Sequence, residues 1–209
     1  IRFHKFAIEG MQDIQKQTEK SKAFYFPYVE EKRGVADKLL IELAKNAAVV
    51  ITDDYPTYFV PQMTAEAKGS IQTTYELVDS NGLLPIRIAE KEYVRAHDFR
   101  RFMHKNIEDF LVEVPEKDPL EYLNLKFDEK LLEPIFKKYE LVDFNKVNTQ
   151  DFLNNLNVDK SVEISDVVGG YNAAKSRLDL FAKKGFNDYS KLRSHPSEDA
   201  SSQLSPYFH

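Results

Sequence analysis

Apolar residues recur at helical spacing through the first twenty positions of the chain. The spacings of three and four predict an amphipathic helix to about residue 20, and its apolar positions are Phe3, Phe6, Ala7, Met11 and Ile14. We expect this helix to pack on a sheet. The next segment, 23–29, is short and aromatic, which predicts a strand with Pro27 at its end or at a sheet edge.

Two further strand patterns follow, each after a helical pattern. Residues 48–52 form an unbroken apolar run, which is typical of a strand buried on both faces of a parallel sheet. Residues 73–78 form the other strand pattern, and helical patterns cover 35–47 and 60–68. This alternation of helices and strands predicts an α/β fold with a doubly wound parallel sheet.

The pattern changes after Pro85. A long amphipathic helix is predicted over 93–112, and 114–170 is charged, with two short helices near 129–140 and 149–156. Gly169 and Gly170 then precede a helix from Tyr171 to Gly185. We therefore predict three parts: an α/β domain over 1–113, an interdomain linker over 114–170, and the beginning of an all-α domain over 171–209.

The composition narrows the class of protein. The 209 residues include no cysteine, which argues against disulfides and thiolate metal sites and fits a reducing, cytoplasmic compartment. A net charge of −5 argues against a wholly nucleic-acid-binding surface, and no apolar run approaches the roughly 20 residues of a membrane span. We expect a monomer. We expect no metal site either, because no histidine pair has ligand spacing. P-loop, nucleophile-elbow and Gly-x-Gly-x-x-Gly motifs are absent.

Acidic, loop-forming residues follow both central strand patterns. Asp53 and Asp54 come after the first, and Asp79 and Asn81 after the second. Ligands of open parallel sheets bind beyond the carboxyl ends of the strands, so these residues are candidates to line one crevice for an aromatic or nucleotide-like ligand. The alternative is that they only form the turns and cap the next helices.

Hydroxyl and amide side chains gather close to the C-terminal end of the sequence. Ser201, Ser202, Gln203 and Ser205 precede Pro206, where a helix is predicted to begin. Free N–H groups, a helix dipole and hydroxyl donors together make a phosphate site. The alternative is a serine-rich helix cap that binds nothing.

The same region carries a family resemblance. Tyr189, Arg193 and Pro196, followed by the segment Ser201–Tyr207, resemble the entry of the flavin domain of DNA photolyases and cryptochromes, which reads Y-x3-R…P…(T/S)-S-x-L-S-P-Y. Upstream, Gly169-Gly170 resembles the G-G-x-x-x-A segment of the family. Three further blocks resemble a bacterial photolyase branch, so the resemblance covers nearly the whole chain: 52–56, 78–85 and 99–102.

The resemblance implies an FAD-binding protein. It implies that Tyr189 packs near the phosphate or sugar side of the flavin and that Arg193 faces the DNA backbone. It also implies that the FAD pyrophosphate is held by the hydroxyl and backbone donors of Ser201, Ser202, Gln203, Leu204 and Ser205. Ser201 stands where many members have Thr, and Gln203 where Arg or Asn is common, so the role of Gln203 is the least defined.

The resemblance further implies what the larger protein does. It would repair cyclobutane pyrimidine dimers in UV-damaged DNA with light, by electron transfer from reduced FAD. The α/β domain would be an antenna domain whose crevice takes a second chromophore, a folate or a deazaflavin. A cryptochrome-like photoreceptor without repair and an unrelated α/β nucleotide-binding module are the alternatives.

We expect this chain to be a fragment. The first strand of the family and everything after His209 are absent, so no catalytic residue is assigned and we expect the fragment alone to be inactive. Leu204, Tyr207 and Phe208 are expected to be uncovered.

Overall fold

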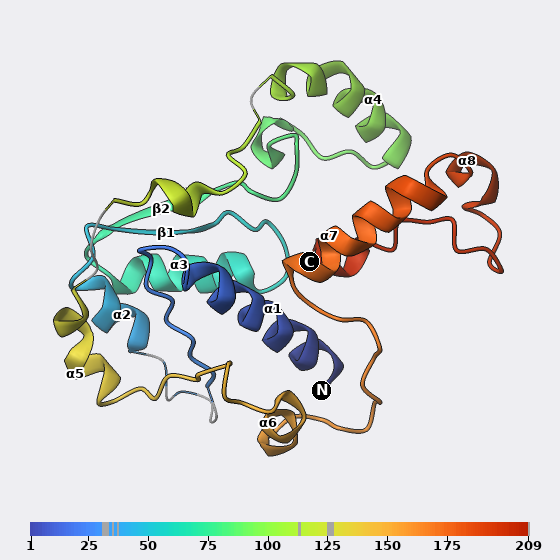
Figure 1. Ribbon diagram of the computed structural model, residues 1–209. Helices are drawn as coiled ribbons and strands as arrows, with labels where there is room; N and C mark the ends of the chain where they lie inside the picture. The colour runs from blue at the N-terminus through green and yellow to red at the C-terminus, as the bar shows by residue number, and fades with distance from the viewer. Residues whose placement is uncertain (31–33, 35, 37, 113, 125–127, 209) are drawn as a thin grey trace. The chain divides into compact units, whose positions relative to one another are not determined.

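The computed structural model describes residues 1–209 with the exception of 31–33, 35, 37, 113, 125–127 and 209 (Figure 1). The chain is a mixture of helices and strands. It forms two compact units, each of which takes several segments of the sequence. Unit 1 comprises Ile1–Val35, Leu120–Asp128 and Glu140–His209, and unit 2 comprises Ala36–Pro119 and Glu129–Tyr139.

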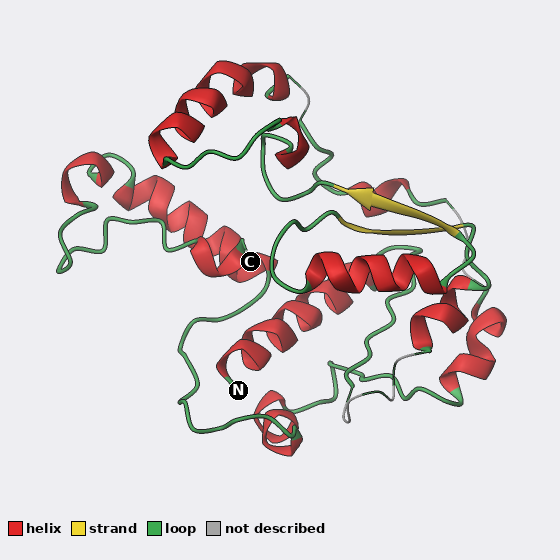
Figure 2. Ribbon diagram, turned by 180° about the vertical axis from the view of Figure 1, so that it is seen from behind, coloured by secondary structure: helices red, strands yellow, loops and turns green. Residues whose placement is uncertain are grey.

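Unit 2 contains a two-stranded parallel sheet. β1 (Val49–Asp53) pairs in parallel with β2 (Thr74–Val78), and Val49 lies opposite Thr74. The helix α3 (Val60–Ser70) joins them and lies along one face of the pair (Figure 2). Parallel strands need such a crossover because a tight turn can join only antiparallel neighbours. The predicted strands and their parallel pairing are confirmed.

The burial expected of the apolar run 48–52, which forms most of β1, is not observed. The side chains of β1 alternate between exposed and half-buried, with Val49 38% and Ile51 59% exposed. On β2, the side chains of Leu77 and Val78 are 41% and 50% exposed. An unbroken apolar run suits a strand between two covering layers, whereas the described sheet has two strands and α3 on one face. The prediction of burial on both faces is therefore wrong for this chain.

Helices and short turns make up the rest of unit 2. The helix predicted over 93–112 is a shorter α-helix that continues into a 3-10 turn. The core lies where α2 meets α5, and its buried side chains include Leu39, Leu132 and Ile135. The elements are α2 (Leu39–Ala44), η1 (Ile86–Ile88), α4 (Ala96–Asn106), η2 (Ile107–Phe110), η4 (Glu129–Leu132) and α5 (Glu133–Phe136).

Unit 1 is helical. Its core joins Ile8 of α1 to Phe144, Leu153 and Leu156, which all come from the predicted linker. The first helix was expected to pack on a sheet, but its contacts in unit 1 are with α6 and α7. The elements of unit 1 are α1 (Arg2–Thr18), η3 (Pro119–Tyr122), α6 (Thr149–Asn155), α7 (Tyr171–Leu180), η5 (Phe181–Gly185), α8 (Tyr189–Leu192) and η6 (Ser205–Tyr207). The first residue of η3, Pro119, belongs to unit 2.

The segment predicted as a first strand, 23–29, has no strand structure. One recorded backbone hydrogen bond involves it, from the N–H of Val142 to the carbonyl of Pro27, at 2.9 Å. Proline has no N–H to donate to a ladder, and this explains why the aromatic pattern did not produce a paired strand. The strand prediction for 23–29 is wrong.

Gly169 and Gly170 bring the beginning of α7 against α1. A Cβ atom on Gly169 would lie 2.1 Å from the carbonyl oxygen of Phe6, and Gly170 has a φ of +95°, which L side chains rarely adopt. The N–H of Gly169 donates to Glu9 at 2.8 Å. The carboxylate of Asp13 accepts from the N–H of Asn172 at 2.9 Å and from its side-chain amide at 3.1 Å. Asp13 thus caps α7 from another helix, because Gly170 at the cap position has no side chain.

Candidate functional site

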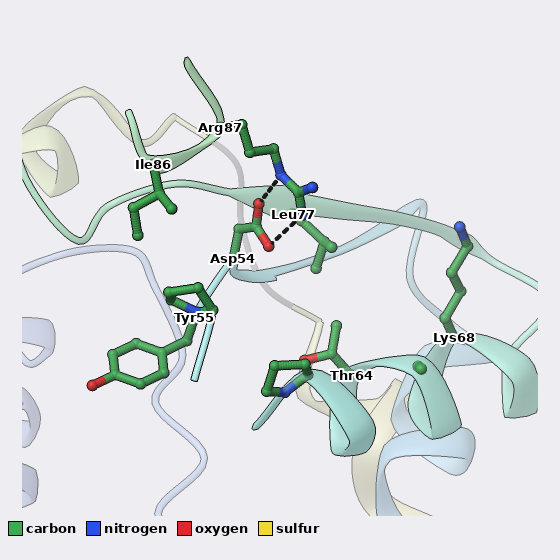
Figure 3. Close-up of a pocket in the computed structure, with 10 residues that line it drawn as sticks. Asp54, Tyr55, Thr64, Lys68, Leu77, Ile86 and Arg87 are labelled. Atoms are coloured by element: carbon green, nitrogen blue, oxygen red, sulfur yellow. Dashed lines mark hydrogen bonds and ion pairs between the residues drawn. The ribbon is translucent and has the colours of Figure 1, made fainter. Parts of the chain in front are cut away.

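The two strand-end loops of unit 2 are joined through a carboxylate and a guanidinium. The N–H of Asp54 donates to the carbonyl of Val78 at 2.8 Å, which extends the parallel pairing past β1. The Asp54 side chain accepts both an Nε and an Nη2 hydrogen bond from Arg87, the latter at 2.8 Å (Figure 3). Such a fork fixes both groups in one plane.

The remaining polar atoms of these loops are used mainly within the loops. Asp79 accepts from the N–H of Ile86 at 2.7 Å and from that of Asn81 at 3.3 Å. The Asn81 amide donates to the carbonyl of Asp54 at 2.9 Å, and the Ser80 hydroxyl donates to Asp53. The structure therefore brings the four predicted residues together. Asp79 and Asn81 act as turn-forming residues, as the alternative interpretation supposed.

A pocket of about 410 Å³ lies beside these loops, between α3, β2 and η1. This volume is within the range of small-molecule sites, roughly 300–1,000 Å³. Of the four predicted residues, Asp54 lines it. Its other lining residues are largely apolar, with two cations: Tyr55, Pro56, Pro61, Thr64, Ala65, Lys68, Leu77, Ile86 and Arg87 (Figure 3).

No pattern in the sequence predicted that Lys68, Ile86 or Arg87 would line this pocket. They come from α3 and η1, and no fixed spacing links them to the acidic loops. Of the three large side chains in the loops that could fill this space, Tyr55 lines the pocket, whereas Tyr58 and Leu83 are 85% and 64% exposed and do not line it.

The charge of the pocket is set by the Asp54–Arg87 pair. The hydrogen bond from Arg87 lowers the pKa of Asp54, and the same bond raises the pKa of Arg87. Both groups are therefore ionised at neutral pH and offset each other. Lys68 adds a positive charge to the lining, which is otherwise largely apolar.

The C-terminal loop of unit 1 differs from the strand-end loops of unit 2 in which of its groups are hydrogen-bonded. Arg177 of α7 donates to the carbonyls of Ser202 and Ser201, at 3.0 and 3.3 Å. In the part of the chain that the structure describes, no acceptor is recorded for the N–H groups of residues 203–205. No hydrogen bond is recorded there for the hydroxyls of Ser201, Ser202 or Ser205 either. Among the described residues, the loop thus has the carbonyls of Ser201 and Ser202 bound by Arg177, while its N–H groups at 203–205 and its serine hydroxyls have no recorded partner.

The backbone of this loop forms an anion-binding concavity. Gln203 has a φ of +51°, in the left-handed region, and Leu204 has a right-handed conformation with φ −87° and ψ −9°. Successive residues of opposite hand turn their N–H groups toward one point, an arrangement called a nest. The helix predicted at Pro206 is a three-residue 3-10 turn, η6, so the nest and the hydroxyls, rather than a helix dipole, supply the donors.

This donor set suits a phosphate group, which has several acceptor oxygens and no donors when it is ionised. Ser201, Ser202, Leu204 and Ser205 keep their donors available for it. Gln203 contributes its backbone N–H, because its side chain donates to Asp199 at 2.5 Å.

Tyr189 and Arg193 contact each other. The Arg193 guanidinium lies 5.8 Å from the ring centre of Tyr189, and Phe181 packs edge-on against the same ring at 5.8 Å. Arg193 is exposed, and no ion pair is recorded for it in the described part of the chain. No recorded hydrogen bond joins either residue to the loop 201–205 in that part.

The apolar residues near the end of the chain are less uncovered than predicted. Leu204 and Tyr207 are half-buried, whereas Phe208 is 73% exposed. The Tyr207 ring lies 5.2 Å from that of Phe6, and its hydroxyl donates to the carbonyl of Val168 at 2.8 Å. Only the prediction for Phe208 is confirmed.

Neither a metal-binding cluster nor a membrane-spanning helix is found among the described residues. No group of three or more His, Asp or Glu side chains is gathered there in a way that suits a metal ion. No helix among them combines the length and the apolar character that crossing a bilayer requires.

Comparison with known proteins supports one class. No family model matches the chain. Along its whole length, however, the chain is similar to deoxyribodipyrimidine photo-lyases, which confirms the resemblance inferred from the motifs.

Two curated relatives define the similarity. The photo-lyase of Methanothermobacter thermautotrophicus is 24% identical over 209 residues, which is 100% of this chain and 42% of the relative. The photo-lyase of Potorous tridactylus is also 24% identical, over 215 residues, with 100% of this chain and 37% of the relative covered. The chain therefore spans about two fifths of the length of these relatives.

Proposed function

We propose that this chain is part of a light-dependent DNA-repair flavoprotein that splits cyclobutane pyrimidine dimers. The observation that carries the proposal is the loop 201–205, whose free donors and nest suit a phosphate where the photolyase motif predicts the FAD pyrophosphate. The full-length similarity to two proteins named as photo-lyases agrees with it.

The residues of this chain then have separate roles. Ser201, Ser202 and Ser205 give hydroxyl donors to the pyrophosphate, and Gln203 and Leu204 give backbone N–H donors. Tyr189 packs toward the phosphate or sugar side, and Arg193 binds a DNA phosphate as a fork. FAD, when bound, supplies the light-driven electron transfer to the lesion.

The pocket beside Asp54 has a place in the same proposal. It takes the ring of a second chromophore, a folate or a deazaflavin, on its apolar lining, with Lys68 and Arg87 beside an acidic group of the ligand. The parallel pair β1–β2 is then part of a doubly wound antenna sheet. Residues 1–113, 114–170 and 171–209 are the antenna domain, the linker and the beginning of the FAD-binding domain.

The test is flavin retention by the full-length protein. Ser202→Ala and Ser205→Ala each remove one hydroxyl donor, and a lost hydrogen bond costs about 0.5–1.5 kcal/mol, or roughly twofold to thirteenfold in affinity. We expect the flavin absorbance per protein to fall in each variant and further in the double variant.

Ser176→Ala is the matched control. Ser176 lies on α7 in the same unit, but its hydroxyl donates within the helix to the carbonyl of Asn172 at 2.8 Å. We expect it to keep the flavin content of the natural protein. Unchanged flavin content in the double variant would remove the phosphate site from the proposal.

A further inference from the structure

Arg177 is the residue that joins α7 to the proposed phosphate loop. Its side chain is 20% exposed, and its Nη2 donates to Asp199 at 2.8 Å. Together with its bonds to the carbonyls of Ser201 and Ser202, one guanidinium holds three acceptors of the segment 199–202. The sequence motifs do not single out Arg177.

Holding these carbonyls also determines where the amide donors point. In a planar trans peptide the C=O and the following N–H point in opposite directions. The carbonyls of Ser201 and Ser202 face Arg177, so the N–H groups of Ser202 and Gln203 face away from it. Arg177 therefore selects which side of the loop presents donors.

Asp199 links Arg177 to Gln203, the residue with the left-handed φ. The carboxylate oxygen Oδ1 that accepts from Arg177 also accepts from the Gln203 side chain. This bond restrains Gln203 near the conformation that opens the nest. A left-handed φ is costly for a residue other than glycine, so it persists only where surrounding contacts hold it.

The ion pair also keeps Arg177 from acting as the anion ligand itself. Its charge is offset by Asp199, and its recorded donors Nε and Nη2 are directed to loop acceptors. An anion at the loop would then meet peptide N–H groups and hydroxyls.

We propose that Arg177 is a positioning residue for the FAD pyrophosphate: it orients the amides of Ser202 and Gln203 and, through Asp199, holds the Gln203 turn. This inference rests on the proposed function. It predicts that loss of Arg177 weakens the binding of a flavin that carries the diphosphate and leaves the binding of a flavin without it unchanged. A merely structural role would weaken the binding of both flavins equally.

The experiment compares two flavins on the full-length apoprotein. FAD has the diphosphate and riboflavin lacks it, while both have the same ring system. We expect Arg177→Gln to raise the Kd for FAD about tenfold, the cost of misdirected charge-assisted bonds, and to leave the Kd for riboflavin unchanged. Arg177→Lys keeps the charge but loses the fork, and we expect an intermediate loss for FAD.

Lys175→Gln is the matched control. Lys175 is an exposed cation on the same helix, two residues away, and we expect no change for either flavin. Thermal unfolding of each apoprotein identifies a folding defect, and if Arg177→Gln does not fold, the Arg177→Lys result decides.

The outcomes separate the two proposals. A natural protein that binds FAD no more tightly than riboflavin overturns the phosphate site and the role of Arg177 together. A natural protein that prefers FAD, with Arg177 variants that keep this preference in full, overturns only the role of Arg177. Equal losses for both flavins also overturn it, because they indicate a general structural effect.

Discussion

The strand-end loops of unit 2 and the C-terminal loop of unit 1 are both rich in polar residues, but their hydrogen bonds differ. In the strand-end loops, carboxylates accept from a guanidinium, an amide, a hydroxyl and backbone N–H groups of the same region. In the C-terminal loop, the carbonyls are bound by Arg177, while the N–H groups of 203–205 have no recorded acceptor in the described chain. Polar composition alone therefore does not indicate a binding site. What matters is which groups are left free.

The largest effect is expected from a substitution that destabilises unit 1, which contains the C-terminal loop, and leaves the strand-end loops of unit 2 unchanged. Gly169→Ala would place a Cβ 2.1 Å from the backbone of Phe6, so α1 and α7 must move apart. Overpacking of this kind costs about 1–3 kcal/mol and occasionally more. We expect a lower unfolding temperature for unit 1 and loss of flavin retention, with the amide NMR shifts of residues 49–54 and 74–81 unchanged.

Gly69→Ala is the control for that substitution. Gly69 lies in α3, and nothing lies within 4 Å of the Cβ it would gain. An alanine in a helix is about 0.5–1 kcal/mol more favourable than a glycine, so we expect unchanged or higher stability. A Gly169→Ala protein as stable as the natural one would contradict the close approach of the two helices.

A smaller effect is expected at the end of the C-terminal loop. Tyr207→Phe removes the hydroxyl that donates to the carbonyl of Val168, and keeps the ring that packs on Phe6. One such bond contributes about 0.5–1.5 kcal/mol, which corresponds to a Tm lower by roughly 2–4 °C per kcal/mol in a chain of this size. A Tm equal to that of the natural protein would show that the bond adds nothing to the anchoring of the loop.

The smallest effect is expected from opening the network of the strand-end loops. Arg87 lowers the pKa of Asp54, so the ionised carboxylate stabilises the folded chain above the ordinary carboxyl pKa, and this stabilisation is lost as pH falls through the folded-state pKa. We expect Asp54→Asn to be less stable than the natural protein at neutral pH and the difference to disappear in acid. Thermal unfolding from pH 7 to pH 2 measures it, and a difference that is independent of pH would contradict the assignment.

Local patterns predicted much of the fold. The strands β1 and β2, the crossover helix α3 and the helix α7 follow from periodicity and apolar runs that lie within each element. The proximity of Asp54 and Asn81 followed from a rule about strand ends. The segment 23–29 was mispredicted because its aromatic residues suit a strand while Pro27 cannot donate to one.

The partners that determine both candidate sites come from outside these local patterns. Arg87 reaches Asp54 across 33 positions of the sequence, and Arg177 reaches the loop across about 25. The cap that Asp13 provides for α7 spans 159 positions. A single sequence carries no periodic signal for such pairs, because they depend on how the elements pack.

The junction between α1 and the glycine pair also bears on how the chain is made. Glu9 and Gly169 are hydrogen-bonded although 160 positions separate them. Ribosomes add about 5–20 residues per second, so α1 leaves the ribosome roughly 10 to 30 s before its partner segment exists. During that interval the apolar side of α1 has no α7 to cover it, and unit 2 has time to fold first. Chaperones that bind newly made chains should therefore protect α1 until the glycine pair emerges.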